Sequence, residues 1–251
     1  MKILDISGLS LSYQSPRGEL TALKNISFSV DEGEFVSIIG PSGCGKSTLL
    51  SIVAGLLSPT DGTVTLNTGE STRAVGYMLQ SDCLFPWRTI GENIYLGLEL
   101  MGIKDEKNTE YADKLLKQYG LWDFYKSYPS ELSGGMRQRA ALIRTLAVMP
   151  RVLLLDEPFS ALDYQTRLAV NDDIYKIIKN EKKTAVMVSH DISEAISMSD
   201  RVIVLTHRPA EIKTSYDIVF KEGRGSPLLC REKEEFKVYF NHIWRDIDVH
   251  V

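Results

Sequence analysis

A run of glycines, one lysine and two hydroxyl residues carries the chemistry that stands out in this chain: Gly40, Pro41, Ser42, Gly43, Cys44, Gly45, Lys46, Ser47 and Thr48. It follows the apolar run 35–39 and opens into the helix-forming run 49–54, which is the strand, loop and helix setting of a P-loop. Glycines let successive backbone N–H groups point at phosphate oxygens, and the helix N-terminus adds its positive end. We expect Lys46 to reach the β- and γ-phosphates and the Ser47 hydroxyl to hold Mg²⁺. The alternative is a glycine-rich turn that only joins strand to helix.

Two adjacent carboxylates follow a second apolar run. Residues 152–155 are all apolar, and Asp156 and Glu157 come directly after them. Because open α/β sheets bind ligands at the carboxyl ends of their strands, we expect both side chains to face the same site as the P-loop. Asp156 is placed to hold Mg²⁺, directly or through water, and Glu157 to accept a proton from the attacking water. An acidic turn after a strand is common by itself, but the P-loop upstream favours the functional interpretation.

A second glycine-rich helix start lies in the stretch LSGGMRQ, residues 132–138. Ser133 is the predicted N-cap, and Gly134 and Gly135 leave backbone N–H groups exposed to an anion. One chain has no need of two γ-phosphate cradles unless the second serves a neighbouring chain. The stretch resembles LSGGQ, the signature motif of the ATP-binding subunits of ATP-binding-cassette (ABC) transporters. Met136 stands where the short motif has Gln, and the variant LSGGMRQR is similar to importer subunits.

The resemblance covers nearly the whole chain, from Tyr13 to the helix after His190, and it assigns roles to further residues. Gln80 resembles the Q-loop glutamine, which contacts Mg²⁺ and senses the transmembrane partner. Residues 160–163 resemble the D-loop, which crosses the dimer interface. His190 resembles the switch histidine at the γ-phosphate, and Tyr13 the aromatic residue that stacks on adenine. The residues alone also allow a surface amide at Gln80, a helix cap at His190 and an edge-strand core residue at Tyr13.

Length and charge bound the class of protein. A chain of 251 residues suits one large domain, and a formal net charge of -4 argues against a broad nucleic-acid-binding surface. The three cysteines have neither disulfide-framework nor zinc-site spacing, which indicates a reducing cytoplasm. No signal-peptide pattern and no apolar run of membrane-spanning length are evident. We therefore expect any role at a membrane to work through a partner.

Periodicity predicts an α/β fold: a P-loop NTPase-type parallel sheet core with an N-terminal antiparallel β subdomain and an inserted α-helical subdomain. The single ABC ATPase domain would span 1–251. Its core and antiparallel subdomain would comprise residues 1–87 and about 150–225, and its helical signature subdomain about 88–149. Apolar residues among charges predict a C-terminal amphipathic helix over about 228–251.

The connector after Gln80 contains three large apolar residues, Leu84, Phe85 and Trp87, which we expect to be exposed. They would then form a partner surface, or else pack under the helical subdomain; the sequence leaves both open. In the family this groove receives a coupling helix of the membrane subunit. The sequence around Phe85 resembles that of the nitrate, sulfonate and taurine importer group.

A separate prediction concerns Cys44, inside the P-loop. Nearby N–H groups and Lys46 predict that its thiol is readily ionised.

The resemblance implies an ATP-hydrolysing subunit of an import system for a small solute, using ATP and Mg²⁺. It would be a homodimer, or pair with a second ATPase subunit, on the cytoplasmic face of the cell membrane. Its partners would be integral membrane permease subunits and, indirectly, an extracytoplasmic solute-binding protein, with no nucleic acid. A soluble ABC protein acting on nucleic acid or ribosomes is the alternative, although such members resemble tandem cassettes or carry coiled-coil insertions. A GTPase or small-molecule kinase would have no use for the LSGG stretch.

Overall fold

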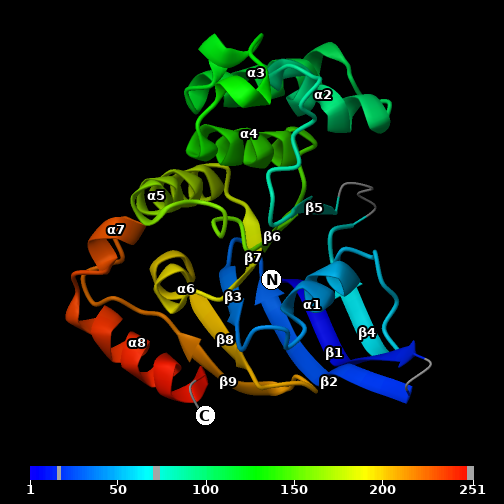
Figure 1. The fold of residues 1–251 in the computed structure, drawn as a ribbon, viewed down its shortest axis with the longest axis vertical. Coiled ribbons are helices and arrows are strands. Elements are labelled where there is room, and N and C mark those ends of the chain that lie inside the picture. Colours follow the sequence, from blue (N-terminus) through cyan, green and yellow to red (C-terminus); the bar gives the residue numbers. More distant parts are fainter. Residues whose placement is uncertain (16–17, 70–73, 248–251) are drawn as a thin grey trace.

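The computed structural model describes residues 1–15, 18–69 and 74–247, and its strands form two sheets (Figure 1). The three-stranded antiparallel sheet has the order β2 (Gly18–Asp31), β1 (Lys2–Ser15), β4 (Asp61–Leu66). The six-stranded sheet has the order β5 (Val75–Met78), β6 (Val152–Asp156), β7 (Thr184–Ser189), β3 (Phe35–Ile39), β8 (Arg201–Leu205), β9 (Ile212–Asp217). Its first five strands are parallel and β9 is antiparallel at the edge. The predicted α/β class, with its antiparallel subdomain, is confirmed.

The central strands β3, β6 and β7 are buried at every residue, as continuous apolar runs in a parallel sheet require. Side chains of β6 alternate between two cores. Leu153 and Leu155 join the core under the helical subdomain, whereas Val152 and Leu154 join the core between the two sheets. The sheet is therefore covered on both faces, and its carboxyl edge is left for the site.

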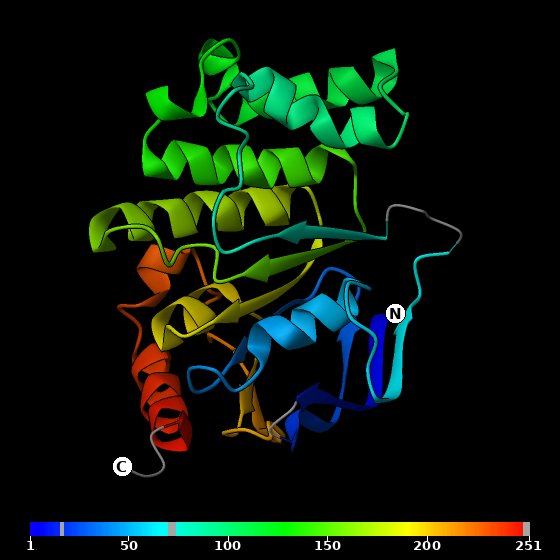
Figure 2. The same cartoon turned by 45° about the vertical axis from the view of Figure 1, so that its right-hand side comes forward.

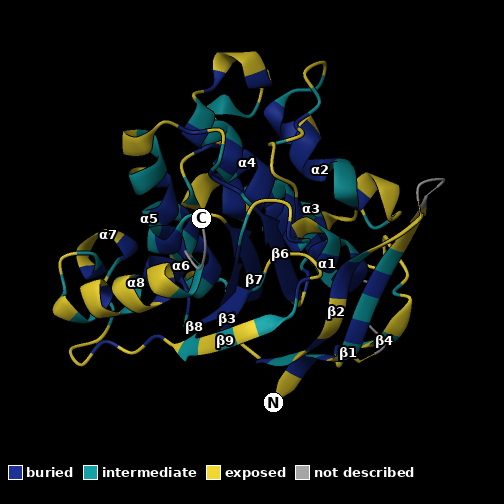
Figure 3. Cartoon of the chain, turned by 60° about the horizontal axis from the view of Figure 1, so that its bottom comes forward, coloured by how far each residue is buried: buried dark blue, intermediate teal, exposed yellow. Residues whose placement is uncertain are grey.

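Helices cover the six-stranded sheet in two layers (Figures 1 and 3). Helix α1 (Lys46–Val53) packs in the same core as the antiparallel sheet through Leu49 and Leu50. The opposite face carries α5 (Tyr164–Asn180), α6 (Ile192–Met198) and α8 (Glu234–Ile247). This layering fixes both ends of the P-loop, because β3 and α1 are each held by a core.

The helical subdomain stands beyond the edge of the sheet formed by β5 (Figure 2). It comprises α2 (Ile90–Leu100), α3 (Glu106–Gln118), the 3₁₀ turns η1 (Trp122–Phe124) and η2 (Pro129–Glu131), and α4 (Gly134–Ala147). A capping box between Thr89 and Glu92 starts α2. Across the described ranges, no helix combines the length and apolar character needed to cross a membrane.

The predicted single C-terminal helix over 228–251 is wrong in its bounds. The structure has a short helix α7 (Pro227–Cys230), then α8 from Glu234 to Ile247, and residues 248–251 lie outside the described residues. The physical reason is a change of partners along the chain: α7 contacts α5 and α6, whereas α8 contacts α6 and β8. The amphipathic character is as expected, since Phe236 and Ile243 are buried.

Candidate nucleotide site

The P-loop joins β3 to α1 and leaves the start of that helix open. Gly43 and Gly45 have φ values of 73° and 120°, in the left-handed region that favours glycine. A Cβ on Gly45 would lie 2.9 Å from Leu23 Cδ2, so the loop also approaches β2 too closely for a side chain. No side chain caps α1, whereas helices α2 to α6 each have a side-chain N-cap. The first N–H groups of α1 are thus left for an anion.

The P-loop residues line a cavity of about 270 Å³ together with Glu157 and Arg208. Lys46 is buried, and its Nζ donates to the carbonyl oxygens of Gly40 at 2.8 Å and Pro41 at 3.1 Å. These bonds keep the ammonium group inside the loop. A polyphosphate in the cavity would meet backbone N–H groups and this cation together.

Asp156 ends β6 directly against α1, as predicted. Its Oδ1 accepts a hydrogen bond from Ser47 Oγ at 2.8 Å, and its Oδ2 accepts one from the Tyr77 hydroxyl at 3.1 Å. Burial raises the pKa of Tyr77 to about 12, and the neighbouring Asp156 charge acts in the same direction. Tyr77 therefore remains a donor at neutral pH. A hydroxyl beside a carboxylate is a donor set suited to Mg²⁺.

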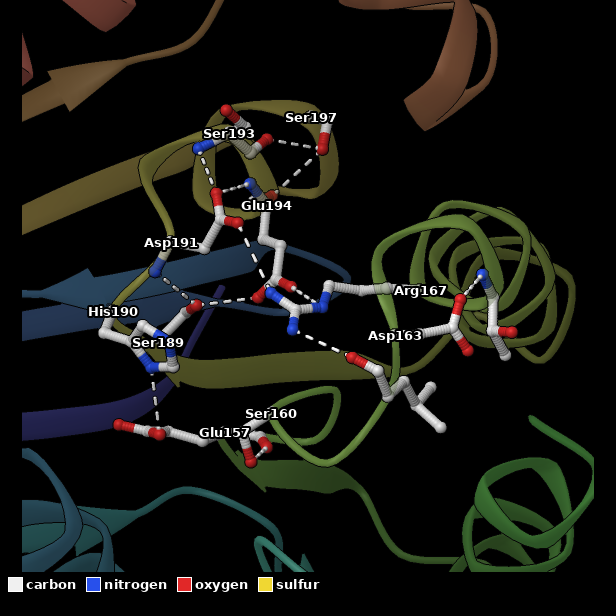
Figure 4. A network of polar contacts seen from close by, with 12 residues as sticks. Glu157, Ser160, Asp163, Arg167, Ser189, His190, Asp191, Ser193, Glu194 and Ser197 are labelled. Atoms are coloured by element: carbon white, nitrogen blue, oxygen red, sulfur yellow. Dashed lines mark hydrogen bonds and ion pairs between the residues drawn. The ribbon is translucent and has the colours of Figure 1, made fainter. Parts of the chain in front are cut away.

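The Glu157 carboxylate contacts two of the other predicted site residues, His190 and Gln80. Its Oε2 lies 3.0 Å from His190 Nδ1 and accepts a hydrogen bond from Gln80 Nε2 at 3.4 Å (Figure 4 draws Glu157 and His190). Its backbone has φ 42°, a strained value for a residue with a side chain, and its N–H donates to Val188 O at 3.0 Å. The strained turn aims the carboxylate away from β6, toward the end of β7.

The three residues His190, Gln80 and Tyr13 had alternative interpretations, and the structure decides two of them. Asp191, not His190, caps α6, so the helix-cap interpretation is wrong. Tyr13 is 41% exposed, and its hydroxyl lies 3.4 Å from Thr48 Oγ1, so it is no core residue. Gln80 is at the surface, but its amide is bonded to Glu157.

The signature residues lie elsewhere. Ser133 Oγ caps its own helix by accepting from Met136 N at 3.3 Å, and none of residues 133–135 lines the P-loop cavity. A Cβ on Gly135 would lie 2.7 Å from Val170 Cγ2 of α5. Gly135 is therefore required for helix packing within this chain, whatever its N–H binds.

Two expectations from the sequence are wrong. Leu84 is buried in the core of the helical subdomain rather than exposed, whereas Trp87 is 70% exposed and stacks on Phe85 with ring centroids 5.0 Å apart. Cys44 is 2% exposed, and burial raises its pKa, an effect larger than the opposing influence of Lys46. The thiol is held neutral instead of being readily ionised.

The sequence analysis did not predict the role of three arginines in and near the site, Arg208, Arg137 and Arg144. Arg208 donates to the carbonyl oxygen of Gly43 at the tip of the P-loop. Arg137 Nε donates to Asp82 Oδ2 at 3.1 Å, and its NH1 donates to Leu132 O at 2.7 Å, so it ties the connector after Gln80 to the signature stretch. Arg144, two turns further along α4, donates to the carbonyl oxygens of Asp82 and Cys83. Arginines seven residues apart on one helix face were the available signal.

Comparison with known proteins identifies the family. The sequence model described as "ABC transporter" matches residues 23–160, which is more than half of the chain. The chain belongs to the ABC transporter family. This ABC protein is 44% identical over 251 residues to the uncharacterized ABC transporter ATP-binding protein YtlC of Bacillus subtilis, covering 99% of this chain and 96% of the relative.

Two further relatives of this ABC protein have names that include a solute. It is 40% identical to the nitrate import ATP-binding protein NrtD of Synechocystis sp., over 93% of this chain and 91% of the relative. It is also 40% identical to the taurine import ATP-binding protein TauB of Jannaschia sp., over 92% and 91%.

A solved structure agrees with the fold and the chemistry. The dimeric structure of a post-hydrolysis state of the ATP-binding cassette MJ0796, bound to ADP and Pi, superimposes with a TM-score of 0.72 at 31% identity. The match covers 86% of this chain and 99% of that one. With these relatives, the chain is an ABC-type ATPase.

Proposed function

We propose that this ATPase powers the uptake of a small solute through separate membrane permease subunits. The observation that carries the ATPase half is the convergence of the Ser47–Asp156 pair and the Glu157–His190 pair beside one P-loop cavity. The import half is supported by the relatives, two of which are named as nitrate and taurine import proteins.

The residues around the cavity have the chemistry for Mg-ATP. The P-loop amides and Lys46 hold the phosphates, and Tyr13, over Thr48, stacks on the adenine. The oxygens of Ser47, Asp156 and Gln80 are hard donors, as Mg²⁺ prefers, and the metal ion would neutralise charge on the phosphates. Two further side chains act on the reacting end of the nucleotide: Glu157 takes the proton of the attacking water, and His190 contacts the γ-phosphate.

A second copy, or a paired ATPase subunit, would complete the site. The cavity is lined by P-loop residues, Glu157 and Arg208, and none of the signature residues 133–135 of the same chain lines it. Ser133, Gly134 and Gly135 of the second subunit would close over the γ-phosphate, and the D-loop would cross between the subunits. The dimeric state of the MJ0796 structure supports a pair of subunits.

The partners and location follow from the same proposal. Trp87, exposed and stacked on Phe85, would contact the permease, and the ATPase would sit peripherally on the cytoplasmic face of the membrane. An extracytoplasmic solute-binding protein would deliver a solute of the nitrate, sulfonate and taurine type. A soluble ATPase uncoupled from transport is less well supported, because two of the relatives are named as import proteins.

The variant Glu157→Gln tests the hydrolytic site. The amide keeps the shape of the side chain but loses its basicity, so we expect hydrolysis to fall about 100-fold or more. Binding of Mg-ATP should persist, and size-exclusion chromatography should show an ATP-dependent dimer. Turnover within a few-fold of the unmodified chain would contradict the general-base role of Glu157.

The variant Trp87→Ala tests the partner surface. We expect it to weaken assembly with the permease, or to uncouple transport from hydrolysis, in co-purification and vesicle transport assays. Trp244→Ala is the matched control, because Trp244 is also exposed, at 52%, but lies on α8. A loss of thermal stability of several degrees in Trp87→Ala, with assembly intact, would place this residue in the packing of the connector instead.

A further inference from the structure

A charged network links the D-loop to the segment that carries His190 (Figure 4). Arg167 lies in the first turn of α5, and its NH2 donates to the carbonyl oxygen of Leu162 at 2.9 Å. Leu162 belongs to the D-loop, residues 160–163. The guanidinium group thus holds the loop that would cross to the second subunit.

The other end of the network is Glu194 of α6. This carboxylate is 4% exposed and accepts a hydrogen bond from Ser189 Oγ at 2.7 Å. The same Ser189 oxygen accepts from Asp191 N at 3.0 Å. Glu194 therefore fixes, through one hydroxyl, the residues on both sides of His190.

The link between Arg167 and Glu194 is incomplete in this conformation. Arg167 Nε lies 3.8 Å from Glu194 Oε1, and Arg167 NH1 lies 3.8 Å from Asp191 Oδ2. Among the described residues, Arg167 Nε is a buried donor with no hydrogen-bond partner. A displacement of about 1 Å would bring the charged pair to hydrogen-bond distance. An unsatisfied buried donor beside a carboxylate favours such a movement.

We propose that Arg167 and Glu194 are positioning residues that couple the D-loop to His190, so that both segments reach their hydrolytic positions together. This rests on the proposed function, because it assumes that His190 and the D-loop serve hydrolysis. Neither side chain lines the P-loop cavity, so both act through Leu162, Ser189 and Asp191 rather than on the nucleotide.

The alternative is that the pair only packs α5 against α6. A second arginine–carboxylate pair joins α5 to α4 instead of α6. Arg139 NH1 of α4 lies 3.7 Å from Asp173 Oδ2 of α5, and Arg139 Nε is likewise buried without a hydrogen-bond partner among the described residues. Among the described residues, this pair forms no hydrogen bond or ion pair with the D-loop or with His190, so it serves as a control.

Protonation of Glu194 gives the proposal a distinctive signature. Burial and the Asp191 charge raise the pKa of Glu194 to about 7, against the opposing influence of Ser189, Arg167 and His190. Above pH 7 the carboxylate is charged and attracts Arg167. Below pH 7 it becomes neutral, and the attraction is lost. Turnover should therefore fall as pH decreases through about 7, in a step that depends on Glu194.

The test is the variant Glu194→Gln, assayed as the full chain for ATP hydrolysis between pH 6 and 8.5. The amide can still accept from Ser189 and carries no buried charge, so folding should persist, with a thermal midpoint at pH 8 no lower than that of the unmodified chain. We expect kcat to fall about 5- to 20-fold at pH 8, the affinity for Mg-ATP to stay within two-fold, and the step near pH 7 to disappear. Arg167→Met should lower kcat similarly, and the double variant should be no worse than the poorer single variant.

The control variant Arg139→Met/Asp173→Asn should keep kcat within two-fold. The proposal is overturned if Glu194→Gln keeps the unmodified kcat and pH profile, or if the control pair lowers kcat as much. Arg167→Lys, which keeps the charge, replaces Arg167→Met if the latter does not fold. Failure of the proposed function would look different, because the unmodified chain itself would then lack hydrolysis sensitive to Glu157→Gln.

Discussion

Two helices of this protein begin with glycine-rich sequence, and their surroundings differ. The start of α1 has no side-chain cap, and Lys46, Asp156 and Glu157 of the same chain surround it. The start of α4 is capped by the hydroxyl of Ser133, and Gly135 packs against α5. Both ends offer backbone N–H groups and a positive dipole end.

On the proposed function, the two termini would bind phosphate in different ways. Around α1 the chain supplies the cation of Lys46, the Ser47–Asp156 pair that would hold Mg²⁺, and the carboxylate of Glu157. This end would therefore bind a nucleotide by itself. Around α4 it supplies an exposed helix start, and the cation of its first turn, Arg137, is engaged with Asp82 and with the carbonyl oxygen of Leu132. The α4 terminus would therefore act on a nucleotide that another subunit carries, which is the asymmetry that a composite site requires.

The variant Ser133→Asp should have the largest effect, and it tests whether the α4 terminus acts on the nucleotide of a second subunit. Asp is as good an N-cap as Ser, so α4 should stay intact, while its charge faces the place where a γ-phosphate must approach. We expect hydrolysis to fall roughly 100-fold, with the stability of the fold unchanged. Binding of a fluorescent ATP analogue to the monomer should stay within two-fold.

Ser133→Ala supplies the control for the cap. It should cost about 1 kcal/mol of stability but add no charge, so its hydrolysis should exceed that of Ser133→Asp. Monomer binding lost in Ser133→Asp would instead place the signature stretch at the nucleotide of its own chain, and the distinction between the two termini would fail.

The variant Gly135→Ala tests how closely the start of α4 packs against α5. The new Cβ would lie 2.7 Å from Val170 Cγ2, so we expect a loss of about 1–3 kcal/mol in the free energy of unfolding, measured in urea. Val170→Ala should relieve the contact, giving a favourable coupling of at least about 0.5 kcal/mol in the double variant. Additive effects would mean that α4 and α5 shift apart freely.

Local sequence patterns correctly predicted the structural features that depend only on residues close together in the chain. The apolar run before Asp156 became a fully buried strand, and Ser133 became the N-cap of α4 as expected. The order of strands in the six-stranded sheet could not be read from the chain, because β3 lies between β7 and β8 through contacts far apart in sequence.

Tertiary contacts decided the residues that were predicted wrongly. Leu84 follows polar residues in a connector, and only the position of the helical subdomain buries it. The bonds of Arg137 to Asp82 and of Arg167 to the D-loop join segments that no local pattern relates. At Cys44 the sequence showed the neighbouring Lys46 but not the burial, which has the larger influence on the thiol.

Replacement of Cys44 should have the smallest effect on hydrolysis. In the proposed site, α1 and the P-loop hold the phosphates through backbone N–H groups and Lys46, and not through the thiol. We expect Cys44→Ala to hydrolyse ATP within two-fold of the unmodified chain. Burial shields the Cys44 thiol and raises its pKa, so the thiolate that attacks maleimide is scarce at neutral pH and increases only as pH rises.

Labelling followed by mass spectrometry should therefore show rapid modification of Cys83, which is exposed, and slow modification of the buried Cys44 and Cys230. Unfolding in urea should make all three equally reactive. Rapid labelling of Cys44 at pH 7 in the folded chain, slowed by Mg-ATP, would contradict this. It would mean that the P-loop opens enough to expose its sulfur, and that the α1 terminus is less rigid than the capped start of α4.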